Sequence, residues 1–358
     1  MPRNRLRTVR AIACIATWES DCEVEDHSET LWDYDAVEPG QSGPPTVVSI
    51  IKEDISWYAL ATQNPSSQFK PNGTCQEWPS VAMPTMVLTY SPLLREEIAK
   101  ANGFVALEWS RTARRQTPFA KCEIRWSRGV LAGDTITSTR RVLEKYVRRG
   151  SRFVTFRVEA TNQNGDEVAQ YDYTCIFDYD ESRKDAPQET RETEASSPDT
   201  VRERYSWEAA RDVGDQLAPL NIQASRENIN EKAAFRLAGK HDPNNLHTDE
   251  ESERRSMFGG PVISGGAAMS YVDQMLMKSF TKGSFYGGRL LLRAIEPFRP
   301  GDTVTFQGEL TSLSEITTTD AGGSQQLVEY RTRSINQRED LVNMSEATLV
   351  LIGLAADK

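Results

Sequence analysis

Apolar and polar residues alternate over several long stretches of this chain, the pattern of strands with one buried face. The stretches form two groups: residues 122–127, 134–144, 152–162 and 167–179, then 290–295, 302–314, 326–336 and 341–353. Each group follows a predicted short helix (52–62 or 225–238) and a longer helix entered through Gly or Pro, which in the second half is the apolar stretch 267–280. We therefore expect an α+β protein in which consecutive antiparallel strands wrap a central helix.

The two groups of elements repeat each other. Gly133-Asp134-Thr135 leads into a strand in the first half, and Gly301-Asp302-Thr303 does so roughly 170 residues later. Two more pairs of landmarks occur in the same order: Pro39-Gly40 with Val213-Gly214, and Met83-Pro84 with Gly260-Pro261. A repeat of this length is typical of domain duplication and not of a solenoid.

The boundary between the halves is predicted from composition. Residues 178–203 are dense in charged residues, Ser and Pro and contain almost no large apolar side chains, so they cannot bury enough surface to pack. We predict a disordered lead-in (1–30), a degenerate first domain (31–180), a linker (181–203) and a catalytic second domain (204–358).

Composition excludes several classes of function. A net charge of −10 argues against nucleic acid or an anionic membrane surface as the main partner, because both require a basic face. The five cysteines are widely spaced and without a Cys-x-x-Cys pair, which predicts reduced thiols and no metal site. No apolar run reaches the roughly 18 residues that span a bilayer. We expect a cytoplasmic protein without cofactor; the Arg-rich start gives a weaker mitochondrial alternative.

The most informative short motif is Asp-Pro-Asn-Asn-Leu-His at 242–247. It places a carboxylate, Asp242, five residues before one of only three histidines, His247. Such a pair can work as a general acid and base on one water molecule. Asn244 is expected to orient the turn or the water. On spacing alone, a turn rich in Asn and Asp with a surface His is the favoured interpretation.

The surrounding residues change that balance, because the motif resembles the signature of the MaoC-like or (R)-specific enoyl-CoA hydratase family in its double hot-dog form. That signature runs Gly-Asp-x-Asn-Pro-Leu-His-x-Asp and continues into a Gly-rich entry to the central helix. The matching positions are Asp242, Asn244, Leu246, His247 and Asp249, then Phe258, Pro261 and Gly265. The resemblance implies two tandem hot-dog domains that form a pseudo-dimer.

The chain departs from the signature in places. Asn245 stands where Pro is usual, which we expect to loosen the turn, and Ser264 stands where His is usual. The first half has no acid/base pair, because Pro65 and Lys70 fall opposite Asp242 and His247. Gln63-Asn64-Pro65 is interpreted as a remnant of the signature. The resemblance implies that the first half shapes an acyl tunnel, or simply replaces a second subunit.

The glycine-rich entry to the second central helix is the candidate oxyanion site. Unpaired amides at a helix N-terminus favour a developing negative charge. Gly265 is the expected donor, with Ser264 and Gly266 beside it in the substrate site. Tight packing of the helix on the sheet is the other explanation for such glycines, and the favoured one for Gly266.

These expectations give three hypotheses. The first is a hydratase or dehydratase of a 2-enoyl or 3-hydroxyacyl thioester, carried on coenzyme A or an acyl carrier. The second is a biosynthetic cyclase or isomerase that uses the same pocket, and the third is a non-catalytic acyl-binding protein. The basic runs 111–115 and 289–293 either meet a carrier phosphate or form a solvated face. A monomer and a further homodimer of double hot-dogs both remain open.

Overall fold

The computed structural model describes residues 29–66, 69, 81–178, 212–240, 242, 244–279, 283–317 and 324–352. The predicted lead-in apart from its last two residues, the linker 181–203, and Lys70 and His241 lie outside the described residues. No helix in the described ranges has both the length and the apolar character needed to cross a membrane.

Ten strands form one sheet in the order β2-β5-β6-β7-β4-β9-β12-β11-β10-β8. The strands of the first half are β2 (Thr46–Ser49), β4 (Phe119–Trp126), β5 (Thr135–Arg148), β6 (Ser151–Thr161) and β7 (Glu167–Asp178). Those of the second are β8 (Leu220–Gln223), β9 (Gly283–Ala294), β10 (Thr303–Thr317), β11 (Ser324–Asn336) and β12 (Leu341–Ile352). The order is symmetric about the antiparallel β4–β9 pair, so the halves join edge to edge.

The repeat seen in the sequence is also present in the backbone hydrogen bonds. Gly133 donates to the carbonyl of Ile50, and Gly301 donates to the carbonyl of Ala224 in the same place of the other half. Both glycines have positive φ, 103° and 86°, a conformation that is strained for other residues. The Gly-Asp landmarks therefore mark one turn that is built twice, and the predicted tandem arrangement is confirmed.

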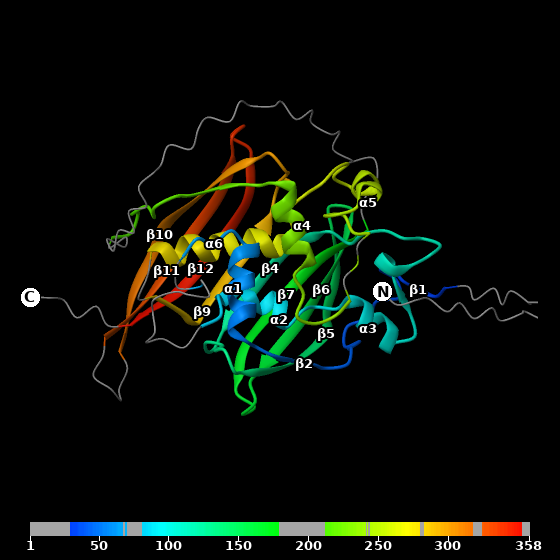
Figure 1. The fold of residues 1–358 in the computed structure, drawn as a ribbon, viewed down its shortest axis with the longest axis horizontal. Helices are drawn as coiled ribbons and strands as arrows, with labels where there is room; N and C mark the ends of the chain where they lie inside the picture. Colours follow the sequence, from blue (N-terminus) through cyan, green and yellow to red (C-terminus); the bar gives the residue numbers. More distant parts are fainter. Residues whose placement is uncertain are drawn as a thin grey trace, which may run out of the picture.

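The helices cover one face of this sheet (Figure 1). The second half contains α4 (Arg226–Ala234), α5 (Glu250–Arg255) and α6 (Gly265–Ser279). The first half contains α1 (Lys52–Ala61), the 3-10 turn η2 (Pro84–Met86), α2 (Val87–Tyr90) and α3 (Arg95–Ala101). A short pair, β1 (Leu31–Trp32) with β3 (Val105–Ala106), and the turn η3 (Leu107–Trp109) complete the described elements.

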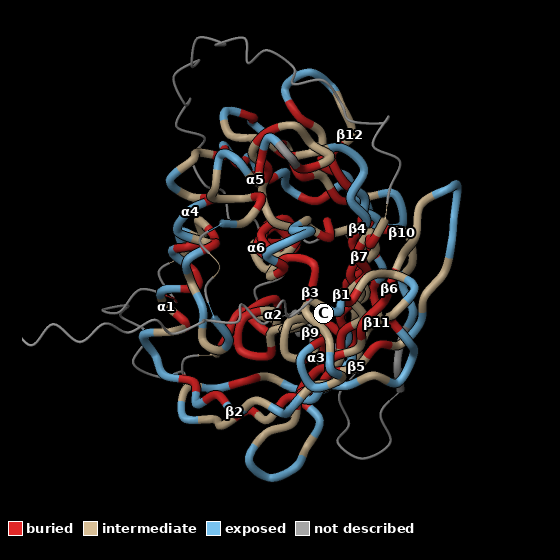
Figure 2. Tube along the Cα trace, turned by 90° about the vertical axis from the view of Figure 1, so that its right-hand side faces the viewer, coloured by how far each residue is buried: buried red, intermediate tan, exposed pale blue. Residues whose placement is uncertain are grey.

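The central helix α6 is buried along most of its length, as Figure 2 shows. It packs against strands of both halves, β4 among them, and against η2. Its residues belong to a hydrophobic core that extends from Val48 in the first half to Leu351 in the second. Because this core crosses the β4–β9 junction, the two halves share one hydrophobic interior.

The long central helix expected in the first half is wrong. Its place is taken by η2 and the four-residue α2, which ends at Tyr90. Ser91 has non-helical dihedrals (φ −125°, ψ 61°), and Pro92 follows it. A proline disfavours helical dihedrals in the preceding residue, so the helix ends there. Helix α4 is also shorter than the predicted 225–238, because Phe235 leaves it in an extended conformation.

Candidate active site

A cavity of about 590 Å³ lies between the two halves, a size typical of small-molecule sites. The first half contributes residues of its interrupted helix and of the segment after it, among them Leu88, Thr89 and Leu93. The second half contributes α4, the motif at 242–247 and the start of α6. The residues that stand where the first central helix would continue therefore form one wall of the cavity.

His247 lines this cavity in a defined protonation state. Its Nδ1 atom is 2.8 Å from the carbonyl oxygen of Val262, which only accepts, so Nδ1 carries the proton. Burial lowers the pKa of His247 to about 4, with nearby Arg236 acting in the same direction. The imidazole is therefore neutral at pH 7, with its Nε2 lone pair as the basic atom.

Asp242 lines the same cavity and is held from the first half of the chain. Nη2 of Arg114 lies 2.8 Å from each carboxylate oxygen of Asp242 and 2.9 Å from the carbonyl oxygen of Asn244. The backbone amide of Asn244 also donates to Asp242. A carboxylate accepts about four hydrogen bonds. The Asp242 carboxylate accepts two from Arg114 and one from the Asn244 amide, which leaves room for water or substrate.

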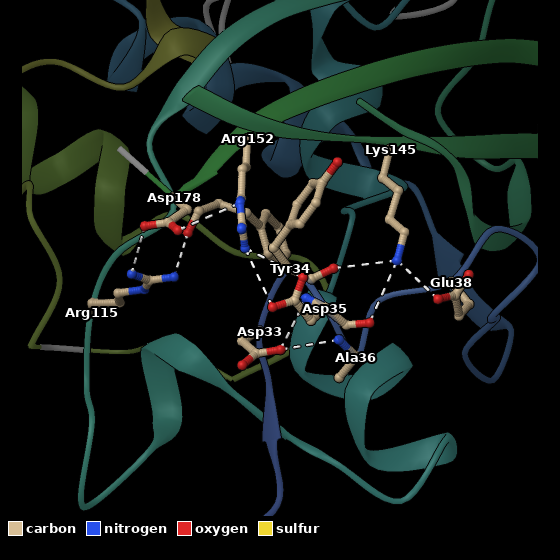
Figure 3. Close-up of polar contacts among 10 residues, drawn as sticks. Asp33, Tyr34, Asp35, Ala36, Glu38, Arg115, Lys145, Arg152 and Asp178 are labelled. Carbon is tan, nitrogen blue, oxygen red and sulfur yellow. Dashed lines mark hydrogen bonds and ion pairs between the residues drawn. The ribbon is translucent and has the colours of Figure 1, made fainter. Parts of the chain in front are cut away.

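The loop that carries Arg114 is fixed on both sides. Arg115 pairs with Asp178 at 3.3 Å and donates to the carbonyl of Phe177, and Figure 3 shows its guanidinium facing the Asp178 carboxylate. On the other side, the Glu29 carboxylate accepts hydrogen bonds from Ser110 and from the amide of Arg111, and these bonds lower the pKa of Glu29 to about 2. Within the basic run 111–115, Arg114 and Arg115 are therefore held in ion pairs within the protein, while the Arg111 side chain stays exposed.

The two asparagines of the motif have different positions. The Asn244 side chain is exposed and does not line the cavity, so the geometry does not support the expected role in orienting water. Asn245 lines the cavity instead. Its side-chain Nδ2 donates to the backbone carbonyl of Asp242 at 2.5 Å, and its Oδ1 accepts from the backbone amide of His247 at 2.8 Å. The prediction that Asn245 loosens the turn is wrong, because its side chain bridges Asp242 and His247.

Ser264, Gly265 and Gly266 all line the cavity at the start of α6. Ser264 closes the helix end, since the amide of Ala267 donates to both its carbonyl and its hydroxyl. A Cβ at Gly265 would lie 2.3 Å from the ring of Phe119, a residue of β4, whereas one at Gly266 would only touch Leu88 at 3.5 Å. Packing against the first half therefore requires the glycine at 265, while the first-turn amides remain directed along the helix axis toward its N-terminal end.

The supposed remnant of the signature in the first half has a structural role. The Gln63 side chain donates to Asn228 at 3.0 Å and accepts from the Tyr271 hydroxyl at 2.9 Å. It therefore ties the first half to α4 and α6. Nothing in these contacts requires an ancestral catalytic turn.

Sequence reasoning missed two charged residues of this region. Arg114 was visible only as one member of a basic run, and its partner lies 128 positions away in the chain. Lys232 was read as part of a predicted helix, yet it lines the cavity. In contrast, Arg289 and Arg293 lie on β9 and pair with Glu123 and Glu346. Within the described residues, no three His, Cys, Asp or Glu side chains are grouped so that they could hold a metal ion.

Comparison of the sequence with protein-family models and with curated proteins finds no match. The structure, however, is similar to several solved structures. A MaoC-like dehydratase is 14% identical, with 87% of this chain and 98% of the other covered at a TM-score of 0.61. A MaoC-like dehydratase from Phytophthora capsici is 15% identical, with 88% and 97% covered at 0.55.

A conserved protein of Mycobacterium tuberculosis described as having a double hot-dog fold is 10% identical, with 89% of this chain and 98% of the other covered at a TM-score of 0.52. At these identities the likeness concerns the fold. It agrees with the symmetric ten-stranded sheet and with the α+β class predicted from the sequence. This chain therefore has the double hot-dog fold, in the form found in solved structures of MaoC-like dehydratases.

Proposed function

We propose that this protein is a hydro-lyase that adds water to a 2-enoyl thioester, or removes it from the 3-hydroxyacyl thioester. The observation that carries the proposal is the neutral His247, whose Nδ1–H is fixed on Val262 while Asp242 lines the same cavity. A neutral imidazole can accept a proton from a water molecule that it holds together with a carboxylate.

In hydration, a water molecule donates one hydrogen bond to His247 Nε2 and the other to Asp242. His247 takes a proton as the water oxygen bonds to the β-carbon, and the electron pair of the double bond moves into the enolate. The α-carbon then takes a proton from the protonated His247, which restores the neutral imidazole. Dehydration follows the same steps in reverse.

The enolate oxygen needs donors that are already in place. The amides of Gly265 and Gly266 lie in the first turn of α6, where helix geometry leaves them without an intrahelical acceptor. The positive end of the helix dipole adds to their effect. Loss of one such donor typically costs about 10²–10³ in rate. The dehydratase descriptions of the structural neighbours support an assignment of the cavity to the addition or removal of water.

Substitution of each of the two residues proposed to hold the water tests the function. His247→Ala and Asp242→Asn should each lower kcat on a short 2-enoyl-CoA by about 10²–10⁴, the range for general acid–base catalysis. Glu231→Gln, on the exposed side of α4, is the matched control and should keep wild-type turnover. Full activity in both site variants would reject the assignment.

The label from ¹⁸O-water separates hydration from the alternative cyclase or isomerase. A hydratase places the label on the β-carbon of the product. A cyclised or isomerised product without label would replace the hydro-lyase by the second hypothesis. Binding of acyl thioesters without turnover of any would favour a non-catalytic acyl-binding protein.

A further inference from the structure

Lys232, on α4, lines the cavity but has no part in the chemistry proposed above. Its Nζ atom is 3.4 Å from the hydroxyl of Thr89 and 4.6 Å from the ring centre of Tyr58. Both neighbours come from the first half and are buried, Tyr58 at 0% and Thr89 at 6% exposure. The amine of Lys232 therefore lies against buried side chains of the first half and not on a solvated helix face.

No carboxylate of the described residues forms an ion pair with Lys232. Burial lowers the pKa of Lys232 to about 7, and nearby Arg236, just beyond the end of α4, acts in the same direction. An ammonium group in such a place is costly unless an anion joins it. The described cavity thus contains an amine for which no described carboxylate supplies a counter-charge when it is protonated.

The other charged groups around the cavity do not supply that counter-charge. Arg95 and Glu108 pair with each other at 2.6 Å, and Asp242 is paired with Arg114. The remaining acidic and basic side chains on the lining are Glu96 on α3, Arg236, Lys240, His247 and Glu296. Among these, the carboxyl of Glu96 acts on Arg236 and not on Lys232, and burial raises its pKa.

We propose that Lys232 binds a carboxylate at the far end of the acyl group, so that the substrate is the monothioester of an unsaturated dicarboxylic acid. This inference rests on the proposed function. The hydroxyl of Thr89 is the second donor to the same carboxylate. Because the two neighbours of Nζ are buried, a carboxylate inside the cavity fits this position better than a phosphate of the carrier, which stays hydrated.

The first experiment measures binding without turnover. Butyryl-CoA and succinyl-CoA have the same chain length and carrier, and differ by a terminal methyl against a carboxylate. Wild-type protein should bind succinyl-CoA about 10- to 100-fold more tightly, the range for a hydrogen-bonded charge. Lys232→Met should remove that preference and leave the affinity for butyryl-CoA unchanged. Lys100→Met, on the exposed side of α3, should keep the preference.

Protonation gives a readout that a merely structural role would not change. With a pKa of about 7, free Lys232 is mostly neutral at pH 8, so binding of a carboxylate should take up close to one proton. Calorimetry in buffers of different ionisation enthalpy measures this uptake, which should be absent for butyryl-CoA and in Lys232→Met. Lys232→Arg should restore the preference for the carboxylate without the proton uptake.

Three outcomes would overturn the proposal. Equal affinity of the wild-type protein for the two thioesters excludes a carboxylate site. An equal loss of both affinities in Lys232→Met points to a carrier phosphate or to a structural lysine. Proton uptake that persists in Lys232→Met assigns it to another group. Since binding is measured without turnover, failure of the hydratase assay alone leaves this test valid.

Turnover then connects the two proposals. On a 2-enoyl-CoA ending in carboxylate and its methyl-ended counterpart, Lys232→Met should reduce kcat/KM for the first by about 10- to 100-fold, mainly through KM. The methyl-ended substrate should keep its wild-type kcat/KM. A wild-type protein that converts neither, yet still prefers succinyl-CoA in the binding test, would reject the hydratase and keep the carboxylate site.

Discussion

The two halves of this molecule have the same turns and strand order, but only the second has an unbroken central helix. In the second half, α6 fills the space inside the strands with 15 residues. In the first, the helix stops at Tyr90, and the segment around Pro92 lines a cavity instead. The first half can lose this helix because the core is shared, so α6 buries apolar surface for both halves.

Polar contacts join the halves at the places where they differ most. Thr85, at the start of the interrupted helix, donates from its amide and its hydroxyl to Asp273 in the middle of α6. Arg114 of the first half pairs with Asp242 of the second, and Gln63 bonds to Tyr271. Residues of the first half thus hold residues of the second half that line or border the candidate site.

The largest expected effect is at Asp273 of α6, which accepts hydrogen bonds from Thr85 at the start of the interrupted helix. Burial raises its pKa to about 7, so the folded protein keeps a proton that the unfolded chain loses above about pH 4. The contribution of Asp273 to the free energy of unfolding is therefore highest at low pH and falls between pH 4 and 7. It should change by on the order of 3 kcal/mol.

Asp273→Asn removes this titration. Urea denaturation of both proteins at pH 4.5 and 7.5 should show that the variant gains stability relative to the wild type as pH rises. His247 has the opposite slope, since its lowered pKa makes the unfolded state bind more protons between about pH 4 and 6.5. An unchanged difference at the two pH values would mean that Asp273 is ionised in the folded protein.

The next effect tests the support that the first half gives to the second. Arg114→Met removes the cation beside Asp242 and should lower kcat/KM by about 10- to 100-fold, the range for a hydrogen bond to a charge. The fold should keep its stability, because the pair is partly exposed. Arg111→Met is the control, since its side chain is 87% exposed and faces Glu29. Equal kinetics of the two variants would show that Arg114 does not position Asp242.

A smaller effect is expected where β4 meets the start of α6. Gly265→Ala places a methyl group against the ring of Phe119 and should cost about 1–3 kcal/mol, as overpacking does. Gly266→Ala has ordinary contact distances and is the matched control. Phe119→Leu in the Gly265→Ala background should recover part of the loss. Thermal unfolding measures all four proteins, and equal melting temperatures of the two alanine variants would contradict the packing explanation.

The smallest effect concerns the Gln63 link. Gln63→Ala removes bonds to Asn228 and Tyr271 and should lower the free energy of unfolding by about 1 kcal/mol per bond. Tyr271→Phe removes only one of these bonds and should cost less. Urea denaturation distinguishes the two. A silent Gln63→Ala would restore the idea that residues 63–65 are only a remnant.

The frame of the fold could be predicted from the sequence because its signals are local. Alternation marked eight of the long strands to within a few residues, apart from an early start of β9 at Gly283, and Gly-Asp landmarks marked turns that need positive φ. The halves were found as repeats for the same reason. The interrupted helix was not predicted, because Met83-Pro84 matches Gly260-Pro261 and so indicates the same long helix in both halves. The signal against it is Pro92, which disfavours helical dihedrals at Ser91.

The candidate site was only partly predictable. The sequence by itself determined the residue types of the motif, its place before an apolar helix and the duplicated frame around it. Only the tertiary structure decided that Arg114 faces Asp242, that Val262 fixes the tautomer of His247, and that Asn245 and not Asn244 lines the cavity. The same holds for Lys232, which lines the cavity without an ion pair to any carboxylate in the described ranges. Most of these properties depend on side chains far apart in the chain and on the water that folding excludes, which no local pattern encodes.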